Sequence, residues 1–360
     1  MDANIKSNIK SNKECGSRQS KSAPITCLHS LSKLEMIDIL LNKYQMSKQD
    51  LLKSTRKELC LLLFKKNYSK AFYDSPLKNT RNSCYIDASL LALLHPIVTL
   101  GVSNFWYKSI LRAKADDSPI HSKIRIELQK ILLNIRTSFR GSGYVGGLSG
   151  NVTNLRKLFA SYKVDNWNQT QQNEWLHTQM DPIDVIGMLE HVFDIPDRNI
   201  FSSGFFRDGK PKKDERVGLV GCPIMPYMLK KADKSVSNLS DFLPIYREET
   251  VDRRLKKTRF LYVHIYRNVN GSKTTKPFIA PMKINGLLLV SAIIHMGSST
   301  ECGHYVSMLK IGKDQWVYCD DMVDKMEVFH ESKFYTHKGG MVKTSGVGFL
   351  YVPEHSISKP

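Results

Sequence analysis

The order of hydrophobic patterns along this 360-residue chain predicts an α+β fold. Between residues 30 and 194, apolar side chains recur every three or four positions, as they do on one face of a helix. From residue 260 onward, apolar and polar side chains alternate or form short apolar runs, as they do in strands. Helices that precede strands in this way predict helices packed on an antiparallel sheet.

Length and composition are those of a globular protein. Hydrophobic residues make up 41% of the chain and charged residues 24%, which allows a substantial core. The longest largely apolar run, residues 287–294, falls short of the ~20 residues that a membrane-spanning helix needs. The first residues contain no apolar stretch typical of a secretory signal. We therefore expect an intracellular protein, in the cytoplasm or the nucleus, without a membrane partner.

The cysteines favour neither disulfides nor zinc. The seven cysteines form no Cys-x-x-Cys pair, and their number is odd; they stand at positions 15, 27, 60, 84, 222, 302 and 319. A structural zinc site usually shows closely spaced ligand pairs, and a disulfide framework an even number of cysteines. We expect no metal and no cofactor.

The N-terminal part of the chain carries much of the net charge of +19. Residues 1–29 are rich in Ser, Asn and Lys and predict a disordered basic arm. Residues 30–66 show two helical apolar patterns around a polar break at residues 47–50, which predicts a helical hairpin. The hairpin weakly resembles the SAP type that binds DNA, so nucleic acid is a candidate partner of residues 1–66. The alternative is a basic helical extension that packs on the domain that follows.

Five helices are expected between this hairpin and residue 194. The first begins at Cys84 and should stop at Pro96, because proline cannot donate to the helical ladder. Amphipathic patterns predict further helices over residues 103–114, 121–140, 152–161 and 179–194. Asp181 stands at the start of the last one, where a carboxylate caps free N–H groups. Strands are expected over residues 260–267, 286–296, 304–311, 315–319 and 346–352.

Cys84 is the candidate nucleophile. It lies in the first turn of a predicted helix, where free N–H groups and the helix dipole stabilise a thiolate. Asn79 lies five residues upstream and offers an amide to an oxyanion, while His304 and Asp320 offer a base and its orienting group on later strands. This order of Cys, His and Asp is typical of a papain-like thiol hydrolase. The plainer interpretation is an inert, buried cysteine.

Several ordered segments resemble the ubiquitin-specific proteases, a family of papain-like deubiquitinases, over residues 68–354. The segment from Leu77 to Tyr85 resembles the cysteine box of the family, and residues 179–186 resemble its Gln-Asp-containing helix. The histidine box is matched by residues 289–297, 303–305 and 316–321, and two core strands by residues 260–267 and 348–351.

The resemblance implies a papain-like catalytic domain over residues 67–354, with a helical thumb that holds the cysteine, a sheet palm that holds the histidine, and a short tail over residues 355–360. It implies hydrolysis of the bond after the C-terminal glycine of ubiquitin by Cys84, His304, Asp320 and Asn79. Asp181 would then bind the ubiquitin tail, and His295 and Tyr305 would line its channel. Asp320 stands four residues after Trp316, as the aspartate of the family does, but Asp321 is an alternative orienting group.

The chain also departs from the family. Arg81 stands where a glycine is usual, and Asp87-Ala88 stands in place of Asn-Ser. The two Cys-x-x-Cys pairs of the usual fingers region are missing, so we expect reduced fingers. The cysteine box is somewhat like that of the cylindromatosis-type branch and of a divergent SUMO-cleaving branch. One alternative function is therefore an isopeptidase for SUMO or another ubiquitin-like modifier. The basic, SAP-like hairpin gives a second alternative, a nucleic-acid-binding protein with a catalytically dead protease fold as its scaffold.

Overall fold

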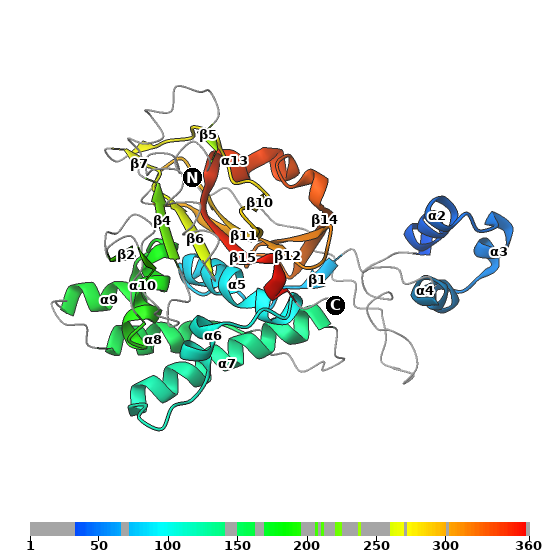
Figure 1. Cartoon of the computed structure of the whole chain (residues 1–360). Coiled ribbons are helices and arrows are strands. Elements are labelled where there is room, and N and C mark those ends of the chain that lie inside the picture. The colour runs from blue at the N-terminus through cyan, green and yellow to red at the C-terminus, as the bar shows by residue number, and fades with distance from the viewer. Residues whose placement is uncertain are drawn as a thin grey trace, which may run out of the picture. The chain divides into compact units, whose positions relative to one another are not determined.

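The computed structural model (Figure 1) describes residues 33–65, 72–140, 150–162, 169–195, 206–207, 210–211, 220–224, 237–238, 260–269, 272–299 and 302–357. The chain divides into two compact units, Met1–Ala71 and Phe72–Pro360. The predicted disordered arm, residues 1–29, lies outside the described residues and stays a prediction.

The described part of the N-terminal unit, residues 33–65, contains three short helices where the sequence predicts two. They are α2 (Lys33–Tyr44), α3 (Lys48–Lys53) and α4 (Arg56–Lys65). The polar segment predicted as a break holds the N-cap Ser47 and the first turn of α3, because polar residues suit a helix start as well as a loop. The helices enclose a small core of their own, made of Met36, Ile37, Leu40, Leu51, Leu59 and Leu63.

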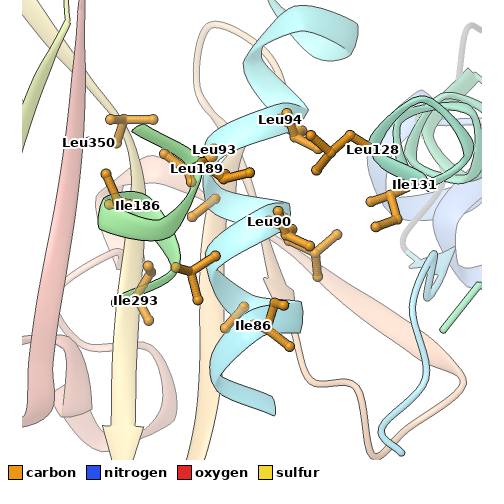
Figure 2. Packing of buried hydrophobic residues seen from close by; sticks show 14 of the residues in the cluster. Ile86, Leu90, Leu93, Leu94, Leu128, Ile131, Ile186, Leu189, Ile293 and Leu350 are labelled. Atoms are coloured by element: carbon orange, nitrogen blue, oxygen red, sulfur yellow. The ribbon is translucent and has the colours of Figure 1, made fainter. Parts of the chain in front are cut away.

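Among the described residues of the larger unit, α5 (Cys84–Thr99) is the central helix, and nearly every residue of it is buried. The core around it also contains residues of α6 (Phe105–Leu111), α7 (Pro119–Arg140), α8 (Thr153–Ser161), α9 (Gln169–His177) and α10 (Pro182–Val192). Helix α13 (Met341–Ser345) contributes Val342 to a separate core. Figure 2 shows α5 between α7 and α10: Leu128 and Ile131 lie on one side of it, and Ile186 and Leu189 on the other. A helix that is apolar all round belongs in a core, and α5 is that helix here.

The prediction that α5 stops at Pro96 is wrong, because the helix continues to Thr99. A proline inside a helix leaves the carbonyl four residues earlier without its usual donor. That carbonyl belongs to Ala92, and it accepts hydrogen bonds from Ser291 Oγ (3.1 Å) and from the ring of His95 (3.2 Å). Side chains thus replace the lost backbone bond, and the helix survives.

The main sheet has the strand order β1-β14-β13-β12-β11-β15-β6-β4, with β10 also paired to β11. Its strands are β1 (Phe72–Asp74), β4 (Val220–Ile224), β6 (Leu261–Ile265), β10 (Lys283–Ile284), β11 (Leu287–Met296), β12 (His304–Lys310), β13 (Gln315–Cys319), β14 (Lys325–His330) and β15 (Gly346–Pro353). Neighbours are antiparallel except β4 and β6. Short pairs lie outside this sheet: β2 (Phe206–Arg207) with β3 (Lys210–Pro211), β5 (Ser237–Asn238) with β9 (Phe278–Ile279), and β7 (Asn268–Val269) with β8 (Ser272–Lys273).

Alternate residues of the sheet face two separate cores. Val290 and Ile293 of β11 pack in the core that contains α5, whereas Leu289 and Ala292 pack in a second core on the other face. The predicted α+β class is confirmed by this arrangement of helices on a largely antiparallel sheet. The arrangement brings the start of α5 close to the start of β12 and to the residues that follow β13. The candidate catalytic residues lie there.

The described residues cover two further expectations only in part. The expectation of reduced fingers falls mostly on residues between 196 and 259 that the structure does not describe, and it stays a prediction. No helix of the described part combines the length and the apolar character that crossing a membrane requires.

Candidate active site

Cys84 is the first residue of α5, and two left-handed residues turn the chain into this helix. Arg81 and Asn82 have φ angles of 48° and 60°. This conformation costs a residue with a side chain roughly 1–2 kcal/mol, which explains why glycine suits the position of Arg81. The N–H of Thr80 donates to Ser83 Oγ at 2.8 Å and closes the turn. The thiol therefore lies at the amino end of the helix, among N–H groups that have no partner within it.

Arg156 fixes the loop before Cys84 and was not singled out from the sequence. Its buried guanidinium donates to the carbonyl oxygens of Trp175 (2.7 Å), Thr80 (3.1 Å) and Arg81 (2.7 Å). The signal was present, since Arg156 stands beside Leu155 on the apolar face of α8. A charged residue on a buried face needs partners of this kind.

His304, at the start of β12, connects the thiol to a carboxylate. Its Nε2 donates to Asp320 Oδ1 at 2.8 Å, and the ring also shares a hydrogen bond with the side chain of Cys84. Burial lowers the pKa of His304, but the bonds to Asp320 and Cys84 and the neighbouring carboxylate charges outweigh it and raise the pKa to about 10. The imidazole is therefore protonated at neutral pH and faces the sulfur as a cation.

The two adjacent aspartates have different neighbours. Asp320 accepts the hydrogen bond of His304, whereas Asp321 Oδ1 lies 3.5 Å from the same nitrogen, beyond a good hydrogen bond. Asp321 Oδ2 instead accepts from the side-chain amide of Asn79 at 3.1 Å, and its carbonyl accepts the backbone N–H of Asn79. One N–H of the Asn79 amide is engaged in this way, and the other makes no hydrogen bond to the described residues.

Gln179 reaches the thiol from the other side of the site. It lies between α9 and α10, and its Nε2 is 3.6 Å from Cys84 Sγ and 3.1 Å from the carbonyl oxygen of Gly303. The sequence pattern placed Gln179 in the Gln-Asp-containing helix, but not against the nucleophile. Its position depends on the loop between two helices, which periodicity does not predict.

His295 and Tyr305 form a buried pair beside this loop. They face each other across β11 and β12, with ring centroids 4.5 Å apart. Burial and then the charge of Lys273 lower the pKa of His295 to about 4, so its ring is neutral. A methyl group on Gly303 would lie 2.4 Å from His295 Nε2, which is an impossible contact. The residue before His304 must therefore be glycine.

Asp181 caps α10, as the sequence predicts. Its carboxylate accepts from the N–H of Ile183 at 3.1 Å, and Asp184 completes a capping box. Asp181 Oδ1 also lies 3.5 Å from His264 Nε2, and 39% of its side chain is exposed. Its charge acts on both Tyr305 and His295. The carboxylate therefore faces the same region as the buried pair while it holds the helix.

Comparison with known proteins identifies the family of the chain. A family model described as ubiquitin carboxyl-terminal hydrolase matches residues 76–339, well over half of the chain. The matched segment contains every candidate site residue, from Asn79 to Asp321. No curated protein matches the chain. The predicted papain-like fold is confirmed, because it is the fold of that family and the structure has its helices and its antiparallel sheet.

Proposed function

Because the chain belongs to the ubiquitin carboxyl-terminal hydrolase family and is a cysteine-type deubiquitinase, we propose that Cys84, His304 and Asp320 are its catalytic triad. The observation that carries the proposal is the position of His304, hydrogen-bonded to Cys84 on one side and to Asp320 on the other. The catalytically dead scaffold is not favoured, since a scaffold requires none of these contacts.

The proposed reaction is acyl transfer through a thioester. The sulfur of Cys84 attacks the carbonyl carbon of the C-terminal glycine of ubiquitin, and the carbonyl oxygen takes the negative charge. His304 gives its proton to the leaving lysine amine, and the carbon–nitrogen bond breaks. A water molecule, deprotonated by His304, then attacks the thioester and releases ubiquitin and the thiol. Asp320 keeps the imidazole oriented and favours its protonated form.

Asn79 and Gln179 are the candidates for holding the oxyanion. Both present side-chain amides at the site, and amide N–H groups aimed at developing negative charge are the usual stabilisers in acyl transfer. Gln179 already lies 3.6 Å from Cys84 Sγ. Asn79 is anchored by Asp321, which fixes its amide plane with one N–H free.

We assign the ubiquitin tail to the region around Asp181. Its half-exposed carboxylate offers a negative charge to a basic tail, and such complementarity sets the choice of partner more than the affinity. His295 and Tyr305 form the apolar wall of the narrow part that receives the terminal glycines, and Asp321 closes the site behind Asn79.

The test is a Cys84→Ala variant, assayed by hydrolysis of a fluorogenic substrate attached to the C-terminus of ubiquitin. Hydrolysis should disappear while the circular dichroism spectrum is unchanged. Cys302→Ala is the matched control, because Cys302 is an exposed free thiol near the same site and should be dispensable. Full activity of a folded Cys84→Ala protein would end the thiol mechanism.

We also propose that residues 1–66 bind nucleic acid and that the protein acts inside the cell. The nucleic-acid proposal is supported by three exposed lysines of the N-terminal unit, Lys48, Lys53 and Lys57. Binding through phosphates should weaken linearly on a logarithmic salt scale, with a slope that counts the phosphates neutralised. Deletion of residues 1–66 should abolish that binding and leave hydrolysis of ubiquitin substrates unchanged. Equal affinities of the full and shortened chains would exclude it.

A further inference from the structure

Behind the catalytic triad, a second carboxyl group lies in an environment that does not suit a negative charge. Asp87 is on the first turn of α5, and its side chain is completely buried. Its Oδ2 accepts a hydrogen bond from Ser83 Oγ at 2.6 Å. Its Oδ1 accepts no hydrogen bond from a donor among the described residues. A buried carboxylate with one neutral donor would carry a large desolvation cost.

The neighbour of Asp87 is the carboxyl group of Asp321, and the two side chains share a hydrogen bond. Asp321 is also buried, and its Oδ2 accepts from Asn79. Two carboxylates have no proton to place between them, so a hydrogen bond between two carboxyl groups requires that one of them be protonated.

The surroundings indicate which of the two carries the proton. Asp321 has the protonated ring of His304 at 3.5 Å and the amide of Asn79 as stabilising neighbours. Asp87 faces Asp321 and the side chain of Cys84, both of which oppose a negative charge, and has only the hydroxyl of Ser83 in its favour. Burial first, and then the charge of Asp321, raise the pKa of Asp87 well above its usual range.

We propose, on the basis of the deubiquitinase function above, that Asp87 is a positioning residue that keeps its proton at neutral pH and donates it in a hydrogen bond to Asp321. Through Asp321, this bond holds the Asn79 amide and the carboxylate beside His304. The donors form one directed chain, from the N–H of Thr80 to Ser83 Oγ, from Ser83 to Asp87, and from Asp87 to Asp321. The chain joins the loop before Cys84 to the turn after β13.

Substitution of Asp87 by asparagine or by leucine distinguishes a hydrogen-bonding role of this residue from a role in packing alone. Asp87→Asn keeps the shape, accepts from Ser83 with its oxygen and donates to Asp321 with its amide, as a protonated aspartic acid does. Asp87→Leu keeps a similar volume but has no donor. We expect Asp87→Asn to hydrolyse ubiquitin substrates at close to the wild-type rate, and Asp87→Leu to lose ~10²-fold in kcat. KM should change little, because Asp87 is fully buried and cannot touch the substrate.

A spectroscopic measurement tests the proton without relying on activity. Wild-type protein labelled with ¹³C at aspartate carboxyl carbons should show, at neutral pH, the infrared C=O stretch of a protonated carboxyl, and Asp87→Asn should lack it. The proposal is overturned if the wild type has no such band, if the band persists in Asp87→Asn, or if folded Asp87→Asn is as slow as Asp87→Leu.

The infrared result is interpretable even if one variant does not fold, because the wild type alone reports whether a protonated aspartic acid is present. Absence of any hydrolysis by the wild-type protein, with the band present, would refute the proposed function and leave the shared proton standing.

Discussion

The imidazole Nε2 of His304 donates to Asp320 Oδ1 at 2.8 Å, and this bond gives Asp320 and its neighbour Asp321 different roles. Nε2 is engaged by Asp320, so the other ring nitrogen is the one available to Cys84. Asp321, one residue later, turns to Asn79 instead. The strand β13 ends at Cys319, so consecutive residues after it are free to point at different partners.

Asp320→Asn should lower kcat by up to ~10⁴-fold, because an amide in this place favours the wrong tautomer of the imidazole. Asp324→Asn is the matched control: its carboxylate makes an exposed ion pair with Lys78, of a kind that contributes little. Steady-state kinetics with a ubiquitin substrate measure both variants. Comparable losses in the two variants would contradict the assignment of Asp320.

Gln179→Ala should lower kcat by ~10²-fold or more if its amide holds the oxyanion, since removal of one such donor costs ~10²–10³-fold. The effect should appear in kcat more than in KM, because the charge develops only in the transition state. Gln129→Ala removes the same functional group from the exposed face of α7 and should have no effect. An unchanged kcat for Gln179→Ala would leave Asn79 as the sole side-chain amide for this role among the residues described.

Gly303→Ala should impair activity because its new methyl group cannot fit beside His295 Nε2 and the carbonyl oxygen of Met296, each at 2.4 Å. The backbone that carries His304 must then move. Gly187→Ala is the opposite case: it lies inside α10 with no atom within 4 Å of the added carbon, and should stabilise the protein by roughly 0.5–1 kcal/mol. Thermal unfolding and steady-state kinetics of the two variants measure this contrast. Equal activity and equal stability of the two variants would contradict it.

The pH dependence of stability should reflect the bond between His304 and Asp320. The pKa of His304 is raised from 6.5 to about 10 in the folded protein, so its contribution is complete below pH 6.5 and is lost as the pH rises towards 10. The wild type should therefore be more stable than Asp320→Asn at pH 6, and this advantage should shrink steadily up to pH 10. Urea unfolding at a series of pH values measures it. A stability advantage of the wild type over Asp320→Asn that grows with pH would contradict this prediction.

The parts of the site that depend on local sequence were predictable. Cys84 was placed at a helix start by the apolar pattern after it, and His304 at a strand start by the alternation that follows. Asp320 was favoured by its spacing from Trp316. The structure has Cys84 as the first residue of α5 and His304 as the first residue of β12, because each position depends on one element and its own periodicity. The preference for Asp320 depended on the resemblance to the family and stays a prediction.

The parts that depend on contacts between distant segments were not predictable. Helix α9 was missed because its sequence is mostly polar and has no apolar face to detect. The approach of Gln179 to Cys84 depends on a loop, and the extension of α5 beyond Pro96 depends on Ser291 from another element. The proposed proton between Asp87 and Asp321 was not predictable either, because each residue by itself is an ordinary aspartate in the sequence.

Labelling with two modifier probes tests the central claim most directly. Ubiquitin and SUMO that carry the same C-terminal thiol-reactive group are offered in parallel, and the modified residue is identified by mass spectrometry. We expect the ubiquitin probe to form an adduct at Cys84, and to form none with Cys84→Ala although Cys302 remains. Labelling of Cys84 by the SUMO probe alone, or reaction of the ubiquitin probe at another cysteine, would contradict a ubiquitin hydrolase that uses Cys84.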